Sequence, residues 1–407
     1  MDLVFIVASF AVVAAVVMLL VLIIVFASKA LLPSGSVEID INEGDRKLEV
    51  QPGSSLLASL GENDIYLPSA CGGGGTCAMC KCVVKEGGGA LLPTESGQVT
   101  RREALDGYRL SCQLKVKNDL KIEIPPDILE VKKFTGTVKS NRNVATFIKE
   151  LVIELPPEIQ IDFRAGGYIQ IDIPEYELSF RDFEIDDEYK ADWEKYDLFD
   201  IEASNDEPCF RAYSMASYPA EKDVIILNVR IATPPPGMNV PPGIASSYIF
   251  NLKPGDEVVM SGPFGEFYWR DTEREMVYVG GGAGMAPMRS HIFDLLKTHG
   301  SERKISYWYG ARSCRERFYD EEFEELEQKH PNFSYHIALS EPLPEDKWEG
   351  PTGFIHKVLL EEYLDQHPDP QEIEYYLCGP PPMIAAVKNM LYNLGVESEM
   401  ISYDEFS

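Results

Sequence analysis

Residues 71–80 read Cys71-Gly-Gly-Gly-Gly-Thr-Cys77-Ala-Met-Cys80, and a fourth cysteine, Cys112, follows 32 residues after the third. Three closely spaced thiolates with a distant fourth are the ligand pattern of a [2Fe–2S] cluster, in which four cysteines bind two irons. The glycines between the first two cysteines let the backbone wrap closely around inorganic sulfur, because glycine adopts conformations that other residues avoid. The spacing therefore predicts that Cys71, Cys77, Cys80 and Cys112 are metal ligands.

A structural zinc site and disulfide bonds are the alternatives for these cysteines. Zinc usually takes its ligands from two close pairs, and Cys112 stands alone in the sequence. Five residues separate Cys71 from Cys77, whereas the plant-type spacing has four. In this respect the loop resembles the adrenodoxin-like and bacterial variants of the ferredoxin fold. Cys82 lies outside the ligand spacing, and we expect it to be a buried thiol.

The length and net charge of the chain limit its number of domains and the classes of partner that it can bind. The 407-residue chain carries a net charge of −29. Nucleic-acid binding depends on Lys and Arg side chains that neutralise phosphates, so this balance argues against a nucleic-acid partner. An acidic surface instead favours solubility and association with basic patches on partner proteins. The length predicts two or three domains once the N-terminal segment is set aside.

The first residues predict a membrane anchor. Residues 3–28 form an uncharged run, LVFIVASFAVVAAVVMLLVLIIVFAS. As a helix rising ~1.5 Å per residue they would extend about 39 Å, enough to cross a hydrocarbon core about 30 Å thick. A cleaved signal peptide is the alternative, but the run is long and no basic residue precedes it. Lys29 follows at once, which places the rest of the chain in the cytoplasm, where reducing conditions keep thiolates available for iron.

Periodicity divides the chain after the anchor into three domains. Residues 36–129 have the element order of a β-grasp (α+β) 2Fe-2S ferredoxin domain and begin with a hairpin over 37–50. Residues 130–270 contain short strands punctuated by Gly and Pro, which predicts an antiparallel β-barrel. From 271 to 407 strands alternate with helices, as in a doubly wound parallel α/β sheet. Residues 1–35 are then the transmembrane helix and its linker.

An acidic insert interrupts the predicted barrel at residues 175–207. Its only basic residues are Arg181, Lys190 and Lys195. Stretches rich in Asp and Glu are usually solvated loops, and this is our first expectation. Aromatic residues keep a partner-docking or membrane-proximal insert as the alternative; they are Phe180, Phe183, Tyr189, Trp193, Tyr196 and Phe199.

A flavin site is predicted around Arg211-Ala-Tyr213-Ser214. A flavin bound to a barrel needs a flat side chain against its ring, a cation for its pyrophosphate and a hydroxyl near N5. Alternate strand residues share a face, and arginine matches the geometry of phosphate. Downstream, residues 242–248 read as a loop opening a helix, where free N–H groups and small hydroxyls can hold a diphosphate. The expected contacts of that loop are Gly243, Ser246 and Ser247.

Two further loops predict a nicotinamide-nucleotide site. The first follows a strand and opens a helix, so its glycines allow a pyrophosphate to approach the helix N-terminus. The second ends another strand of the same sheet, and ligands bind at such carboxyl edges, so we expect the loops to face each other across a nicotinamide crevice. The candidate contacts are Gly281, Gly282, Gly284, Met285, Ala286 and Pro287 in the first loop and Cys378, Gly379, Pro380 and Met383 in the second.

These motifs together resemble a known family. Residues 130–407 resemble the ferredoxin–NADP reductase superfamily, with R-x-Y-S for flavin, G-G-G-x-G-x-A-P for the nucleotide and C-G-P-P-x-M near the nicotinamide. With an N-terminal ferredoxin and an apolar start, the whole chain resembles the F subunits of sodium-translocating NADH:quinone oxidoreductases. The resemblance implies electron input: hydride passes from NADH to FAD, and single electrons then pass through a [2Fe–2S] cluster to other membrane subunits. It also implies a bacterial inner-membrane location.

The resemblance implies roles for particular residues. Ser214 would hydrogen-bond flavin N5, and Cys378 would pack near the nicotinamide C4. Glu405 would polarise the carboxamide side, and Phe406 would cover the flavin face opposite Tyr213 and swing aside for nicotinamide. The protein supplies placement and electrostatics for chemistry that belongs to the cofactors.

The choice between NADH and NADPH stays open at the level of residues. A 2′-phosphate needs cations after the second strand of the nucleotide domain, and Arg312, Arg315 and Arg317 lie there. These arginines lean towards NADPH, whereas the family resemblance implies NADH. Arg312 is in either case a candidate nucleotide contact.

Two other functions compete with this interpretation. The reductase component of a bacterial aromatic or methane monooxygenase has the same cofactor set but lacks an apolar start and the insert. A non-catalytic redox sensor would need the cluster but not the flavin and nicotinamide loops. A single apolar helix whose only polar residues are Ser9 and Ser28 cannot line an ion path, so we expect sodium pumping to belong to partner subunits.

Overall fold

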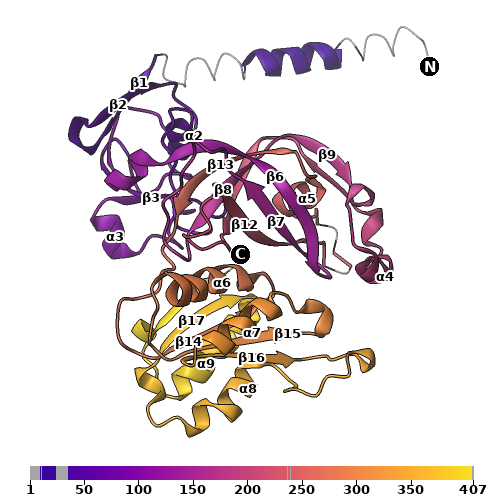
Figure 1. Ribbon diagram of the computed structural model, residues 1–407. Coiled ribbons are helices and arrows are strands. Elements are labelled where there is room, and N and C mark those ends of the chain that lie inside the picture. Colours follow the sequence, from indigo (N-terminus) through magenta and orange to yellow (C-terminus); the bar gives the residue numbers. More distant parts are fainter. Residues whose placement is uncertain (1–9, 11, 24–34, 236, 239, 406–407) are drawn as a thin grey trace. The chain divides into compact units, whose positions relative to one another are not determined.

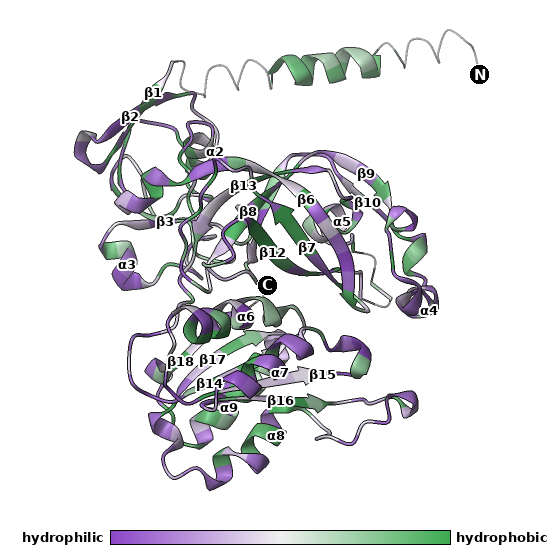
Figure 2. Ribbon diagram, in the orientation of Figure 1, coloured by the Kyte–Doolittle hydropathy of each residue, from purple (hydrophilic) through white to green (hydrophobic). Residues whose placement is uncertain are grey.

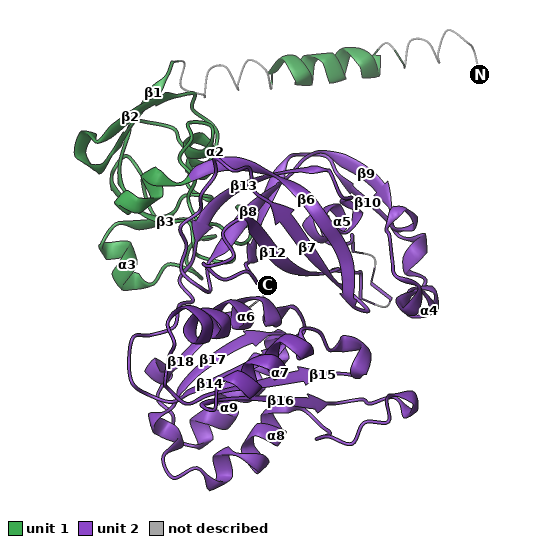
Figure 3. Cartoon of the chain, viewed as in Figure 1, with its two compact units in different colours: residues 1–131 green, residues 132–407 purple. Residues whose placement is uncertain are grey.

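The computed structural model describes residues 10, 12–23, 35–235, 237–238 and 240–405. The chain divides into two compact units, residues 1–131 and 132–407 (Figures 1 and 3). The first contains the cysteine motif, and the second contains both the predicted flavin and the predicted nucleotide motifs.

The structure describes only part of the predicted N-terminal transmembrane helix. Residues 12–23 are helical with exposed apolar side chains, coloured as hydrophobic in Figure 2. Residues 3–9, 11 and 24–28 of the predicted span lie outside the described residues. Within the part of the chain that is described, no helix has both the length and the apolar character needed to cross a bilayer.

The first unit is a five-stranded sheet in the order β2-β1-β5-β3-β4. The predicted hairpin over 37–50 is confirmed, because β1 pairs antiparallel with β2, and β1 also pairs parallel with β5. Alternate residues such as Ile39 and Ile41 point into the core and are fully buried. The elements are β1 Val37–Ile41, β2 Arg46–Val50, α2 Leu56–Gly61, β3 Lys81–Glu86, α3 Arg101–Leu105, β4 Tyr108–Leu110 and β5 Leu120–Glu123.

The second unit begins with a six-stranded antiparallel sheet in the order β11-β8-β13-β6-β7-β12. This confirms the predicted antiparallel strands, and β7 and β12 stand out as hydrophobic in Figure 2. Helix α5, Ile244–Asn251, packs its Ile249 and Phe250 into the core of this sheet. The strands are β6 Lys132–Ala145, β7 Ile148–Glu154, β8 Tyr168–Ile173, β11 Cys209–Ser214, β12 Val224–Arg230 and β13 Glu257–Phe264.

The prediction of a solvated loop at residues 175–207 is wrong. The insert folds into a hairpin, β9 Tyr176–Ser179 with β10 Glu202–Asn205, around helix α4, Asp187–Lys195. Phe180 and Trp193 are completely buried and pack with Phe250 and other core residues of the barrel. The charge of the insert did not reveal this core, because most of its acidic side chains are exposed whereas four aromatic side chains are buried; these are Phe180, Phe183, Tyr189 and Trp193.

A parallel five-stranded sheet completes the second unit, in the order β16-β15-β14-β17-β18. All its strand pairs are parallel, as predicted for a doubly wound sheet, whereas β18 and helices α7 and α8 were not predicted. The carboxyl ends of β14 and β17 lie side by side, because Gly280 pairs with Cys378. The elements are β14 Met276–Gly281, α6 Met285–Phe293, β15 Ile305–Ala311, α7 Asp320–Lys329, β16 Phe333–Leu339, α8 Ile355–Glu362, β17 Glu374–Gly379, α9 Pro381–Asn393 and β18 Ile401–Glu405.

Candidate functional site

The four predicted ligand cysteines come together as two pairs of free thiols. Cys77 Sγ donates to Cys71 Sγ at 3.3 Å, and Cys80 interacts with Cys112 in the same way. These hydrogen bonds lower the pKa of Cys71 to about 3 and the pKa of Cys112 to about 7. Two pairs of thiols fit the two irons of a [2Fe–2S] cluster, one pair for each iron. Among the described residues, no three ligating side chains gather closely enough to hold one metal ion.

The glycine loop between these cysteines has the backbone that the cluster prediction requires. Gly72, Gly73 and Gly75 adopt positive φ angles of 62°, 91° and 78°. A Cβ at Gly75 would come within 2.7 Å of the Gln113 side chain. Other residues disfavour these conformations, so the loop can approach a cluster closely only as a glycine run. Cys82 is buried outside the pairs, and burial raises the pKa of its thiol to about 12, as predicted for a structural cysteine.

A buried ion pair that sequence reasoning missed positions the last ligand. Arg109 binds both carboxylate oxygens of Glu95, with 2.6 Å between its Nη2 and Glu95 Oε2, and also binds the carbonyl of Gly88. Glu95 Oε1 accepts the backbone N–H of Leu110, two residues before Cys112. Burial opposes the charge of Glu95, yet the Arg109 hydrogen bonds keep the pKa of its carboxyl below the usual value. This network fixes the strand that leads to the fourth cysteine.

The predicted flavin residues lie on β11, at the edge of the six-stranded sheet. Arg211 and Tyr213 share one face of the strand, since they pair with Ile171 and Ile169 of β8. Ser214 points to the other face. Tyr213 is partly buried against the barrel core, and that burial raises the pKa of its phenol. A cation and a flat ring on one strand face are the groups that a flavin nucleotide needs.

The loop before α5 meets only part of its prediction. Gly243 is the N-cap of the helix, and a larger residue would clash there, because an added Cβ would lie 2.6 Å from the Cβ of Ala232. Ser246 is buried and its hydroxyl accepts the Ala232 N–H at 3.1 Å, while Ser247 is completely buried beside Tyr176. The two hydroxyls are therefore engaged in packing, and the helix N-terminus itself is the feature suited to a diphosphate.

The two nucleotide loops touch directly instead of facing across an open crevice. A Cβ on Gly284 would lie 2.1 Å from the carbonyl oxygen of Cys378, and one on Gly379 would lie 2.8 Å from that of Gly281. The glycines thus serve close packing of β14, α6 and β17 as well as approach to a phosphate. Gly282, with φ of 57°, is partly exposed and best placed for that approach.

The other predicted nucleotide contacts differ in their burial. Met285, Ala286 and Pro287 are buried in the first turn of α6, and Tyr307 donates its hydroxyl to Met285 Sδ at 3.2 Å. Pro380 is exposed and Met383 is partly exposed at the start of α9. The sequence pattern placed both loops at one edge of the sheet, but it could not distinguish side chains that pack beneath the loops from groups on their surface.

A carboxylate outside the predicted set joins the flavin strand to the nucleotide sheet. Asp404 Oδ2 accepts a hydrogen bond from Ser214 Oγ at 2.9 Å. Asp404 pairs with Cys378 in the β17–β18 register, and Cys378 is completely buried. Burial raises the pKa of Asp404 and of the Cys378 thiol. Glu405 ends β18, but its side chain lies outside the described residues, as does all of Phe406.

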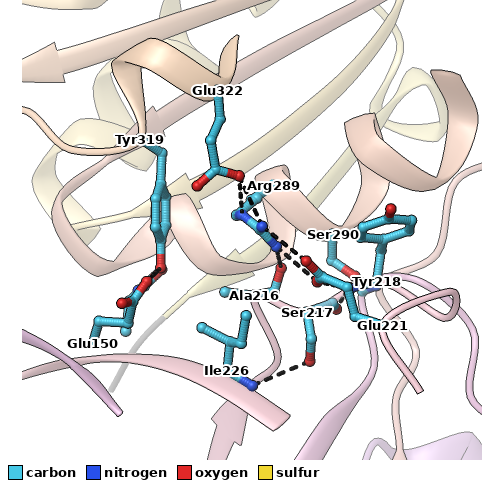
Figure 4. A network of polar contacts seen from close by, with 12 residues as sticks. Glu150, Ala216, Ser217, Tyr218, Glu221, Ile226, Arg289, Ser290, Tyr319 and Glu322 are labelled. Carbon is cyan, nitrogen blue, oxygen red and sulfur yellow. Dashed lines mark hydrogen bonds and ion pairs between the residues drawn. The ribbon is translucent and has the colours of Figure 1, made fainter. Parts of the chain in front are cut away.

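Helix α6 is fixed to the barrel by a buried arginine (Figure 4). Arg289 pairs with Glu221 at 2.9 Å and with Glu322 at 2.8 Å, and it donates to the Ala216 carbonyl at 2.8 Å. Beside it, Tyr319 donates to Glu150 at 2.6 Å. Ala216 follows the predicted flavin strand by two residues, and α6 begins at the glycine loop, so this network ties the predicted flavin strand to the predicted nucleotide loop.

Three family descriptions match successive parts of the chain. Residues 39–117 match a 2Fe-2S iron-sulfur cluster binding domain, residues 195–269 an oxidoreductase FAD-binding domain, and residues 278–389 an oxidoreductase NAD-binding domain. They coincide with the cysteine unit, the second half of the barrel and the parallel sheet.

Curated relatives are similar over nearly the whole length. The chain is 57% identical over 394 residues to the F subunit of the Na(+)-translocating NADH-quinone reductase of Methylococcus capsulatus, covering 96% of this chain and 97% of that protein. Proteins of the same name from Pseudomonas aeruginosa and Idiomarina loihiensis are 56% and 55% identical, and the matches cover 96% of this chain and 96% of each.

Solved structures share the fold at lower identity. The Amycolatopsis cytochrome P450 reductase GcoB superposes with a TM-score of 0.62 at 23% identity, covering 91% of this chain and 98% of that one. The ferredoxin reductase in carbazole 1,9a-dioxygenase superposes with a TM-score of 0.59, also at 23% identity and with the same coverage. These likenesses concern the fold alone.

Proposed function

Because the chain belongs to the family of F subunits of the Na(+)-translocating NADH-quinone reductases, we propose that it is the electron-input subunit of such a complex. It oxidises NADH with FAD and passes single electrons through a [2Fe–2S] cluster to the other subunits, which reduce quinone. The observation that carries the proposal is the presence of cluster, FAD and NAD domains, in that order, in one chain more than half identical to named F subunits.

The donor groups suit the cofactors. Two pairs of free thiols at the glycine loop would hold the two irons through Cys71, Cys77, Cys80 and Cys112. On the barrel, Arg211 would bind the flavin pyrophosphate and Tyr213 would lie against the ring. When bound, the flavin accepts a hydride and releases single electrons, and the cluster carries them one at a time.

The residues around Ser214 would control a proton. The Ser214 hydroxyl donates to an ionised Asp404, whereas a protonated Asp404 could donate to Ser214 Oγ and free the serine proton for a ring nitrogen. Asp404 is thus a positioning residue that acts through Ser214, and Glu405 keeps its proposed role on the carboxamide side of the nicotinamide. Cys378 is buried behind this pair and would exclude water from it. Phe406 keeps its proposed role as the cover of the opposite flavin face.

We further propose that residues 1–35 anchor the chain in the bacterial inner membrane, with the domains in the cytoplasm. The uncharged run of residues 3–28 and the following Lys29 support this proposal. The partners are then the other membrane subunits of the complex, and ion transport belongs to them. The domain limits at 36–129, 130–270 and 271–407 are part of the same proposal.

The competing function is that of a reductase component of a monooxygenase. The identity to F subunits favours the first function over this alternative. The test is a spectrum of the purified full-length chain before and after NADH. We expect flavin bleaching together with the electron paramagnetic resonance signal of a reduced cluster. A folded chain that binds zinc in place of iron, or that is not reduced by NADH, would contradict the proposal.

A further inference from the structure

Three arginines follow the second strand of the parallel sheet, and each is paired with a carboxylate. Residues 312–317 form this basic loop directly after β15. The pairs are Arg312 with Glu316 at 3.4 Å, Arg315 with Asp192 at 2.7 Å, and Arg317 with Asp320 at 2.8 Å. The carboxylates are less exposed than the arginines they meet, with 15% against 52% for the first pair and 27% against 36% for the second.

The position of the basic loop gives these pairs a functional meaning. Gly310 of β15 pairs with Gly281 of β14 in the parallel register, so the loop begins at the same sheet edge as the glycine loop. In doubly wound dinucleotide folds the residues that follow the second strand lie near the adenosine ribose. There a carboxylate favours the free 2′-hydroxyl of NADH, and an arginine accommodates the 2′-phosphate of NADPH.

One of the three carboxylates comes from the acidic insert of the barrel. Asp192 lies on α4, next to the completely buried Trp193. Trp193 Nε1 donates to the Thr146 carbonyl at 2.8 Å, and Thr146 Oγ1 donates to Glu316 at 2.7 Å. The buried tryptophan therefore fixes the helix that presents Asp192, and the turn that it binds also holds Glu316.

Charge decides what such a loop can bind. A 2′-phosphate adds about two negative charges and accepts strong hydrogen bonds from guanidinium groups. Arginines already paired with carboxylates offer it no uncompensated charge, and the phosphate would have to displace Asp192, Glu316 or Asp320. A nucleotide with a free 2′-hydroxyl has no phosphate at this position and can bind without breaking these ion pairs.

We propose that Asp192 of the acidic insert, with Glu316 and Asp320, makes the chain select NADH over NADPH by occupying the arginines that would otherwise hold a 2′-phosphate. The inference rests on the proposed NADH oxidation and gives the acidic insert a role in nucleotide selection. Asp192 is a specificity-determining residue supplied by one domain to the nucleotide loop of the other.

The test compares Asp192→Asn with Glu188→Gln in the full-length, FAD-loaded chain, using ferricyanide as the electron acceptor. Both substitutions remove one negative charge from α4. Glu188 is exposed one turn before Asp192, and the ion pairs of the basic loop among the described residues are with Glu316, Asp192 and Asp320 instead. We expect Asp192→Asn to raise the ratio of kcat/KM for NADPH to that for NADH by about 5- to 20-fold, mainly through KM, as one gained charge-assisted contact predicts. Glu188→Gln should leave the ratio within about twofold.

A double substitution and a binding measurement complete the test. Adding Arg315→Ala to Asp192→Asn should return the ratio to its original value, because the freed arginine is then missing. Calorimetric titration with 2′,5′-ADP against 5′-AMP gives a readout that does not depend on turnover, and Asp192→Asn should strengthen only the former. Equal ratios for Asp192→Asn and Glu188→Gln, with no gain in 2′,5′-ADP binding, would overturn the inference. If the unaltered chain failed to oxidise NADH, the proposed function itself would fall.

Discussion

Ser214 and Asp404 are joined by a 2.9 Å hydrogen bond although 190 residues separate them in the chain. One lies at the end of the proposed flavin strand and the other on the last strand of the nucleotide sheet. The bond brings a titratable carboxyl to the serine that is expected to hydrogen-bond flavin N5. The proposed flavin strand and the nucleotide sheet therefore meet at this pair.

Replacing Asp404 with Asn should slow NADH oxidation. The amide keeps the size of the side chain but cannot exchange a proton with Ser214, so we expect kcat to fall by about tenfold or more, as for other positioned acids and bases. A merely structural role would not move the pH dependence, whereas we expect the variant to lose one limb of the kcat profile. Steady-state rates of NADH oxidation, measured with ferricyanide between pH 5 and 9, give both the fall in kcat and the shape of its pH profile. An unchanged profile at a reduced rate would exclude this role.

The same substitution should change stability in a pH-dependent way. Burial raises the pKa of Asp404, so the folded chain binds the proton more tightly than the unfolded chain and loses stability as pH rises through the raised pKa. Asp404→Asn removes that loss. We therefore expect its Tm to exceed that of the unaltered protein at pH 8, and the difference to shrink as pH falls towards the usual aspartate pKa. Thermal unfolding of both proteins across this pH range shows whether the difference in Tm has the expected sign.

Single cysteine substitutions should distinguish cysteines that bind iron from cysteines that only pack in the core. Cys112→Ser breaks one of the two thiol pairs, so we expect loss of the cluster absorbance and of most bound iron. Cys82→Ser is the matched control, because Cys82 is also buried but belongs to neither pair. Iron content and visible spectra are the measurements. Full iron binding by Cys112→Ser would remove this cysteine from the ligand set.

The Arg289 network should matter far more than a surface ion pair. Arg289→Ala removes a buried guanidinium and leaves the partly exposed Glu221 and the Ala216 carbonyl without this partner, which should cost about 2 to 4 kcal/mol of unfolding free energy. Arg274→Ala breaks an exposed pair with Glu372 and should cost under about 1 kcal/mol. Urea unfolding of both variants gives the comparison. Because Ala216 follows the flavin strand, we also expect Arg289→Ala to bind FAD more weakly.

The sequence alone determined much of this protein. Cysteine spacing identified the cluster loop, period-two alternation identified β1 and β2, and glycine runs at strand ends marked the loops of the parallel sheet. These signals are local, because ligand spacing, strand alternation and helix starts depend on neighbours a few residues apart. The acidic insert misled the same reasoning, since net charge describes the outer face of a segment and not the Trp193 core beneath it.

Only the tertiary structure decided which charged groups meet. Asp192 and Arg315 are 123 residues apart, and no local pattern relates them. Three arginines after a strand look like a phosphate site until the carboxylates facing them are known. Likewise, Asp404 reaches Ser214 because β18 pairs with β17 and places Asp404 beside Cys378. Electrostatic pairing depends on distance in space and on burial, and the fold sets both.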